Sequence, residues 1–292
     1  MSKEAMSVGF ERISDQLRYM TIRILVSQEN EFNDSGEINW TGSGTGFLYM
    51  LEAHGEVPVL ITNKHVLAGA RLIGLTFHAA TGDKEKPVPE QGPGRLIAIS
   101  SDHAAIFEHP DPDVDLAAIP LMPIVEHVVR MGWHPYIKCL CAKQLPNNSI
   151  KEGLGSIEEI FMVGYPNGLS DTANNFPIVR RGITSTPFCS DYLGRKEFLA
   201  DVPVYGGSSG SPIFVVNEGT WAAGTGLMEG TRFSLLGVLY AGHTQTVNGR
   251  IVAEPVPTNF VSVAKIESMI NLGICIRSEL IEDLAALIPP EV

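Results

Sequence analysis

The sequence predicts an all-β protein, and three observations support this. Many short runs of Val, Ile, Leu and Phe are separated by Gly, Pro, Asn and Asp, which is typical of strands joined by turns. Apolar residues at helical spacing occur only near the two ends of the chain. Hydrophobic residues make up 44% and charged residues 18% of the 292 residues, which is the balance of a folded globular chain. The length fits one large two-lobed domain or two small ones.

The charge distribution indicates which partners to expect. The formal net charge is -12, and the only adjacent basic pairs are Arg180-Arg181 and Arg195-Lys196. Such a chain repels a phosphate backbone, so we expect no nucleic-acid partner and instead a peptide or protein.

Cysteine usage and the N-terminus bear on location and cofactors. The spacing of the four cysteines fits neither a zinc site nor a disulfide framework: Cys139, Cys141, Cys189 and Cys275. The N-terminus has no continuous apolar segment, and no run reaches the roughly eighteen apolar residues of a membrane span. We therefore expect reduced thiols, a cytoplasmic location, no membrane association, no metal and no cofactor.

The predicted elements follow the chain in order. A short amphipathic helix is expected over 4–20, where Phe10, Ile13, Leu17 and Met20 have helical spacing. Strands are expected in these segments: 21–27, the run that follows 40–46, 57–62, 95–100, 116–121, 157–165, 178–185, 196–204, 212–216 and 234–240. Helical spacing returns over 256–272, and helical propensity returns over 278–288.

The stretch 204–214 (VYGGSSGSPIF) places a serine between glycines, directly before an apolar run. Gly207 and Gly210 permit a tight turn and a close approach of substrate to the main chain. Ser209 is the candidate nucleophile. A Gly/Ser/Pro cluster between strands is also the composition of an ordinary solvated loop, so the hypothesis requires a base and an acid elsewhere.

His65 and Asp115 are the candidates for that base and acid. His65 lies where the apolar run 57–62 ends, and Asp115 lies 50 residues later, directly before the apolar run 116–121. Asp111 and Asp113, in the preceding turn, are interpreted as solvated acids.

The order His, Asp, Ser and the three flanking motifs resemble the trypsin and chymotrypsin superfamily of serine peptidases. TNKHV at 62–66 resembles the segment of the general base, DVDLAAI at 113–119 that of the acid, and GSSGSP at 207–212 the nucleophile turn. TGSGTGFL, VGYPNGL and RRGITS are most similar to the disulfide-free bacterial branches, namely HtrA-type proteases and glutamyl endopeptidases. The resemblance covers roughly residues 21–257.

This resemblance implies two six-stranded β-barrels of chymotrypsin type, with a short N-terminal helix and C-terminal helices. The expected division is an N-terminal extension over 1–20, a first lobe over 21–125, a connection over 126–155, a second lobe over 156–257 and C-terminal helices over 258–292.

The resemblance also implies roles for the site residues. His65 would take the proton of Ser209, Asp115 would fix the His65 tautomer, and the amides of Gly207 and Ser209 would bind the oxyanion. Ser208 stands where trypsin-like zymogens carry an acid that pairs with a new N-terminus. A hydroxyl cannot hold an ammonium in that way, so we expect activation without N-terminal insertion.

The substrate-binding residues are expected around two segments. By resemblance, Tyr240-Ala241-Gly242 borders the specificity pocket and Pro203 lies near its base. Pro203 brings no charge, which argues against a preference for Lys or Arg. His243 could favour an acidic side chain, although an ordinary loop histidine is the alternative.

Two other functions are alternatives to an active serine endopeptidase. A catalytically silent chymotrypsin-fold module for protein binding stays open, although such a module has no chemical need for the triad. An α/β-hydrolase esterase would require Gly-x-Ser-x-Gly and the reverse residue order. Because no inhibitory domain is evident, control by a regulatory protein partner or by a disordered active site is also expected.

Overall fold

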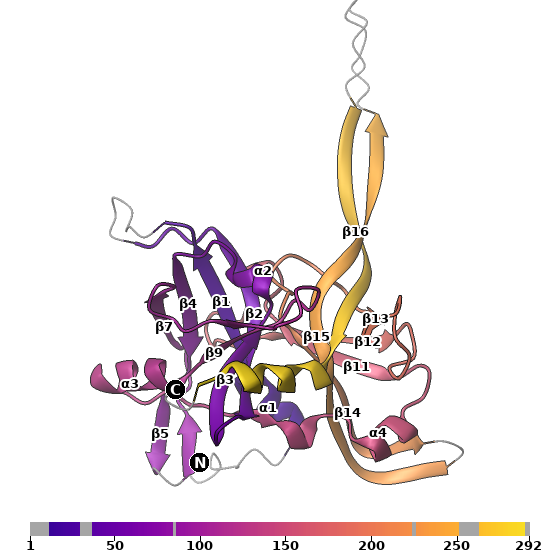
Figure 1. Cartoon of the computed structure of the whole chain (residues 1–292), viewed down its shortest axis with the longest axis horizontal. Helices are drawn as coiled ribbons and strands as arrows, with labels where there is room; N and C mark the ends of the chain where they lie inside the picture. The colour runs from indigo at the N-terminus through magenta and orange to yellow at the C-terminus, as the bar shows by residue number, and fades with distance from the viewer. Residues whose placement is uncertain (1–11, 30–36, 84–85, 224–225, 251–262, 290–292) are drawn as a thin grey trace, which may run out of the picture.

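The protein folds into two β-sheet lobes that pack side by side, with only short helices around them (Figure 1). The structure is a computed structural model and describes residues 12–29, 37–83, 86–223, 226–250 and 263–289. The prediction of an all-β fold with few helices is confirmed.

The first lobe is a sheet of eight strands in the order β7-β4-β1-β2-β3-β9-β8, with β10 pairing in parallel to β2. The strands are β1 (Thr21–Ser27), β2 (Gly42–Glu52), β3 (Glu56–Thr62), β4 (Leu72–Phe77), β7 (Arg95–Ser100), β8 (Phe107–Glu108), β9 (Ala117–Pro120) and β10 (Leu140–Cys141). A separate hairpin consists of β5 (Ala80–Asp83) and β6 (Lys86–Pro89).

The prediction of a closed six-stranded barrel is wrong for this lobe. The two ends of the sheet, β7 and β8, do not pair with each other among the described strands. β8 has only 2 residues, and the chain between β7 and β8 forms a turn instead of a strand, so too few backbone groups are available to close the ladder.

The second lobe is a closed barrel with the strand order β11-β12-β13-β16-β15-β14, and here the prediction of a six-stranded barrel is confirmed. Its strands are β11 (Glu159–Gly164), β12 (Ile178–Thr184), β13 (Glu197–Asp201), β14 (Pro212–Ala223), β15 (Gly226–Arg250) and β16 (Val263–Arg277). All neighbouring pairs are antiparallel.

The C-terminal helices predicted over 258–292 are wrong for the most part, because β16 occupies Val263–Arg277. β16 pairs with both β13 and β15 and so closes the barrel, and this pairing overrides the local helical spacing. The second lobe therefore extends past residue 257, while residues 251–262 lie outside the described residues. A helical segment does follow as the 3₁₀ helix η4 (Ser278–Leu287), near the predicted 278–288.

Short helices connect and cover the lobes. They are α1 (Ile13–Met20), α2 (Lys64–Leu67), α3 (Met122–Arg130), η2 (Ala142–Gln144), α4 (Asn148–Gly153) and η3 (Pro166–Gly168). α1 lies within the helix predicted over 4–20, of which residues 4–11 lie outside the described residues. η4 leaves the second lobe and returns to the first, where Leu280, Ile281 and Leu284 share one core cluster with Tyr49 of β2.

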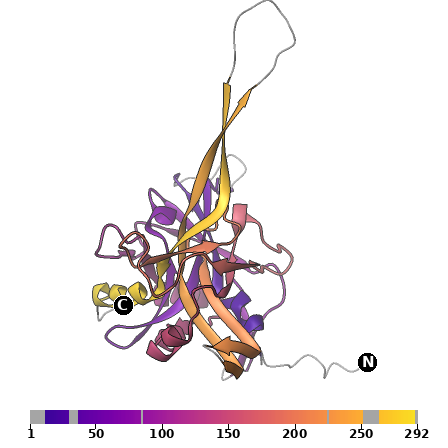
Figure 2. The ribbon, with the colours of Figure 1, turned by 90° about the vertical axis from the view of Figure 1, so that its right-hand side faces the viewer.

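A long hairpin projects from the second lobe. β15 and β16 continue beyond the barrel as a two-stranded ribbon, which Figures 1 and 2 show rising away from both lobes. Their pairing is described out to Arg250↔Val263.

Candidate active site

His65 lies on α2, the short helix that begins directly after β3, and it pairs with Asp115. Its ring Nδ1 lies 2.5 Å from Asp115 Oδ2, and its backbone N–H donates to Asp115 Oδ1 at 3.1 Å. Asn63 also holds Asp115, because its side-chain amide donates to the backbone carbonyl oxygen of Asp115 at 2.6 Å. The His65 side chain is 48% exposed and that of Asp115 only 20%. The imidazole therefore faces solvent, and the carboxylate lies beneath it.

Asp115 remains ionised in this setting. Burial raises the pKa of its carboxyl, but hydrogen bonds and charge attraction from the His65 ring, together with backbone N–H groups of Lys64 and His65, lower it, and the net pKa lies below the ordinary value. An ionised carboxylate only accepts hydrogen bonds, so the proton of the neutral imidazole is on Nδ1. The other ring nitrogen, Nε2, is then free to accept a proton.

The serine turn between β13 and β14 depends on its glycines. Gly207 has a φ of 79° and Gly210 a φ of 85°, which L side chains rarely adopt. A Cβ at Gly210 would lie 1.9 Å from the carbonyl oxygen of Thr45, and one at Gly207 would lie 2.6 Å from that of Tyr165. The main chain of the turn therefore approaches both lobes more closely than a side chain would allow.

The amides of the turn fall into two groups. Those of Ser208, Gly210 and Ser211 donate to the carbonyl oxygens of Tyr205, Leu239 and Ser208, at 3.0, 2.8 and 3.1 Å. Within the described residues, those of Gly207 and Ser209 donate to no protein acceptor. These two amides, which flank Ser208, are therefore available to a ligand.

Thr45 of β2 fixes the turn from the first lobe. Its backbone N–H donates to the Ser209 carbonyl at 2.9 Å, and its hydroxyl donates to the Gly207 carbonyl at 2.9 Å. The hydroxyl also accepts the Tyr165 N–H at 3.0 Å, and Thr45 is fully buried. This residue was missed in the sequence analysis, where TGSGTGFL indicated only the entry to a strand.

β2 also brings the serine turn and His65 side by side. Thr45 contacts Ser209. The neighbouring residue, Gly44, contacts Val66, which follows His65, so closely that a Cβ on Gly44 would lie 2.4 Å from a methyl carbon of Val66. In the described structure the Ser209 hydroxyl nevertheless forms no hydrogen bond with the His65 ring. It lies 3.5 Å from the carbonyl oxygen of Tyr240.

Comparison with known proteins identifies the family of this arrangement. The family model described as "Trypsin-like peptidase domain" matches residues 44–223, which is more than half of the chain. The chain belongs to this family. It is a trypsin-like peptidase, a hydrolase of chymotrypsin-type fold, as the resemblance implied.

Solved structures similar to the peptidase include proteases. One is the inactive form of Rv3671c from M. tuberculosis, a serine-to-alanine mutant, with 13% identity, coverage of 99% of this chain and 95% of that chain, and a TM-score of 0.45. Another is the HtrA-type protease AlgW with a decapeptide, with 15% identity, coverage of 96% and 67%, and a TM-score of 0.47. No match was found among curated proteins.

The peptidase carries a positive charge near Pro203 that the sequence analysis missed. The Arg180 guanidinium, on β12, donates to the Pro203 carbonyl and lies over the Tyr205 ring, 4.8 Å from its centroid. Arg180 precedes Pro203 by 23 residues, and only the pairing of the barrel strands brings it here. The surroundings of Pro203 are therefore charged, although Pro203 itself is not.

Tyr240 is held by a polar chain that joins the two lobes. Its hydroxyl donates to buried Glu197 at 3.0 Å, Arg195 lies 3.7 Å from Glu197, and Arg195 also pairs with Asp113 at 3.2 Å. Burial, and then the hydrogen bond and charge of Glu197, raise the pKa of Tyr240 to about 12, so the phenol stays protonated. Asp113, interpreted as a solvated acid, thus links the Asp115 loop to the strand that faces Ser209.

The other predicted pocket residues follow Tyr240 on β15. Ala241 and Gly242 pair with Ile274 and Gly273 of β16, and a register shift falls between Gly242 and Thr244. His243 occupies this irregularity, where a β-bulge can redirect a side chain. It is partly buried.

Ser208 is engaged within its own turn. It is almost completely buried, and its hydroxyl accepts the Tyr205 N–H at 3.4 Å. Ser208 therefore forms a local hydrogen bond at the position where trypsin-like zymogens carry the acid that pairs with the new N-terminus after cleavage.

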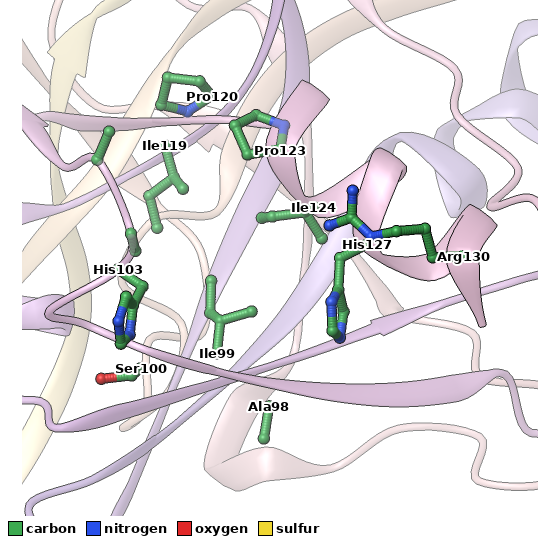
Figure 3. A pocket seen from close by; sticks show the side chains of 12 residues that line it. Ala98, Ile99, Ser100, His103, Ile119, Pro120, Pro123, Ile124, His127 and Arg130 are labelled. Atoms are coloured by element: carbon green, nitrogen blue, oxygen red, sulfur yellow. The ribbon is translucent and has the colours of Figure 1, made fainter.

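A cavity of about 340 Å³ lies on the first lobe. Figure 3 shows His103 and His127 on either side of Ile99, with Arg130 beside His127 on α3. No residue of the candidate triad lines this cavity.

Among the described residues, no helix has the length and apolar character required to span a bilayer.

Proposed function

We propose that the peptidase is a serine endopeptidase that hydrolyses peptide bonds in proteins through an acyl-enzyme. His65 is the general base, Asp115 orients it, and Ser209 is the nucleophile. The observation that carries this proposal is the two-point contact of Asp115 with the ring and backbone of His65. It fixes the tautomer that leaves Nε2 free to accept a proton.

Attack begins with a rotation of the Ser209 side chain. Its hydroxyl leaves the Tyr240 carbonyl, which it meets at 3.5 Å, a long contact that costs little to break. In the new position Oγ donates to His65 Nε2 and attacks the substrate carbonyl carbon as the proton moves to the imidazole. Asp115 stabilises the resulting imidazolium.

The amides of Gly207 and Ser209 bind the oxyanion of the tetrahedral intermediate. They have no protein acceptor in the described structure, whereas their neighbours in the turn do. Removing one such donor typically costs about 3 kcal/mol in the barrier. The intermediate then collapses as His65 protonates the leaving amine, and the acyl-enzyme is hydrolysed by a water that His65 deprotonates.

Arg180 supports the expectation that Lys and Arg are poor residues at the cleavage site. Its charge lies against the Pro203 carbonyl, and a second cation nearby would be repelled. We therefore expect uncharged or acidic side chains to be preferred there, with His243 able to contribute.

The alternative is a catalytically silent protein-binding module, and one observation favours it. The Ser209 hydroxyl points to Tyr240 and forms no hydrogen bond with His65 in the described structure. Hydrogen bonds of catalytic groups are often long or absent before substrate binds, so an active enzyme is compatible with this geometry.

Hydrolysis of fluorescein-labelled β-casein, a disordered protein, tests the two functions against each other. Wild type should release peptides, whereas Ser209→Ala and His65→Gln should not, although both variants should remain folded. Equal release of peptides by wild type and Ser209→Ala, at the background level, would favour the silent module.

A further inference from the structure

β15 has two neighbouring strands that cover different parts of it. β14 pairs with its first part, and the last pair is Pro212↔Val238. β16 pairs with its second part, from Gly237 to Arg250. Beyond Val238, therefore, one edge of β15 is covered by no described strand.

This open edge begins at the reactive serine. The main chain of Leu239 is still bound to the serine turn, through Ser211 at 2.9 Å and Gly210 at 2.8 Å. The next residue, Tyr240, presents its carbonyl to the Ser209 hydroxyl at 3.5 Å. From there the edge follows the projecting hairpin (Figures 1 and 2) and continues about 20 Å past Thr244, at the usual rise of a strand.

This open edge of β15 lacks the usual protection against pairing with another chain. Natural edge strands are commonly protected by Pro, Lys or bulges. The sequence over 240–250 (YAGHTQTVNGR) contains neither Pro nor Lys, and its only basic or acidic residue other than His243 is Arg250 at its end. Both register shifts against β16 lie at or before Thr244, so 244–250 is a regular ladder with one free row of N–H and C=O groups.

We infer that the free edge over 244–250 binds an extended segment of the protein substrate, on the N-terminal side of the scissile bond. This rests on the proposed function, in which the substrate carbonyl meets Ser209 beside the Tyr240 main chain. A substrate chain lying antiparallel on β15 meets Thr244 next and Arg250 last. Main-chain hydrogen bonds then add the substrate to the sheet as a further strand.

The continuity of the edge with the active site distinguishes this occupant from a second copy of the chain. A strand of a second copy that extended to Tyr240 would cover the position in front of Ser209 and exclude substrate. A substrate, in contrast, can occupy the position in front of Ser209 and the free edge over 244–250 at the same time. Because the contacts are made by the backbone, the site selects extended, unfolded segments without Pro at the pairing positions, rather than a fixed sequence.

The test uses the full chain and peptides around one cleavage site mapped in β-casein. Four peptides share the same residues after the scissile bond and carry three, five, seven or nine residues before it. We expect kcat/KM to rise at least about tenfold from three to nine residues, because each pairing residue adds main-chain hydrogen bonds. Single N-methylation of the longest peptide should lower kcat/KM at every second amide beyond the third residue, with the intervening amides as matched controls.

Each outcome decides the inference. A kcat/KM that is complete with three residues, or an N-methyl effect without the period of two, overturns it while leaving the proposed function intact. A stable dimer with no gain from longer peptides assigns the edge to a second copy and also overturns it. If no peptide is cleaved and Ser209 does not react with a fluorophosphonate, the proposed function fails and the inference fails with it.

Discussion

Replacement of Thr45 by valine tests how the first lobe positions Ser209, the proposed nucleophile. The change keeps the shape of the side chain and removes a buried hydroxyl that donates to the Gly207 carbonyl at 2.9 Å and accepts the Tyr165 N–H at 3.0 Å. Each unsatisfied buried group costs about 1–3 kcal/mol, so the two groups left by Thr45→Val should lower the free energy of unfolding by roughly 2–6 kcal/mol. The Gly207 carbonyl loses its anchor, so kcat should fall at least about tenfold while KM changes little.

Urea unfolding and peptide kinetics measure both effects. Thr41→Val is the matched control, because the Thr41 hydroxyl is exposed and its loss should change stability by less than about 0.5 kcal/mol. Thr45→Ser keeps the hydroxyl and should restore most of kcat, which keeps the test informative if the valine variant is poorly folded. A Thr45→Val variant with wild-type kcat and a stability loss below about 1 kcal/mol would refute the proposed role of Thr45.

Four further predictions concern the site. Asp115→Asn should lower kcat by about 10⁴, because an amide facing Nδ1 favours the wrong His65 tautomer, whereas Asp111→Asn should have little effect; steady-state kinetics of both variants decides this. Because the pKa of Asp115 is lowered on folding, the stability that its ionised carboxylate contributes is complete above about pH 4 and is lost as pH falls through the folded-state pKa. A difference in unfolding free energy between wild type and Asp115→Asn that grew toward acid would contradict this. Gly207→Ala should reduce kcat by about 10²–10³, since the backbone amide would move, and unchanged kcat would argue against the oxyanion role. Tyr240→Phe should cost about 1–3 kcal/mol in urea unfolding, because it removes a hydrogen bond to the buried carboxylate of Glu197, and an unchanged midpoint would contradict that.

The candidate triad could be predicted because its signals are local. His65, Asp115 and Ser209 each lie beside a short apolar run, and such runs are visible in the sequence alone. The structure places His65 and Asp115 in contact. It packs both the Ser209 turn and α2 against β2. The catalytic roles of the three residues stay predictions.

The remaining features depend on pairing between distant segments. Arg180 and Thr45 reach the site only through strand register and lobe packing, which one sequence does not reveal. The region over 256–272 was predicted as a helix because Val261, Ile266, Met269 and Ile270 have nearly helical spacing. In its described part, Val263–Arg277, the free backbone edges of β13 and β15 decide in favour of a strand.

Labelling with a fluorophosphonate probe tests the central claim most directly. The full-length wild-type chain is incubated with the probe at neutral pH, and the modified residue is mapped by peptide mass spectrometry. The account predicts a single adduct on Ser209 that is absent in Ser209→Ala and strongly slowed in His65→Gln. Equal, low labelling of wild type and Ser209→Ala would contradict it.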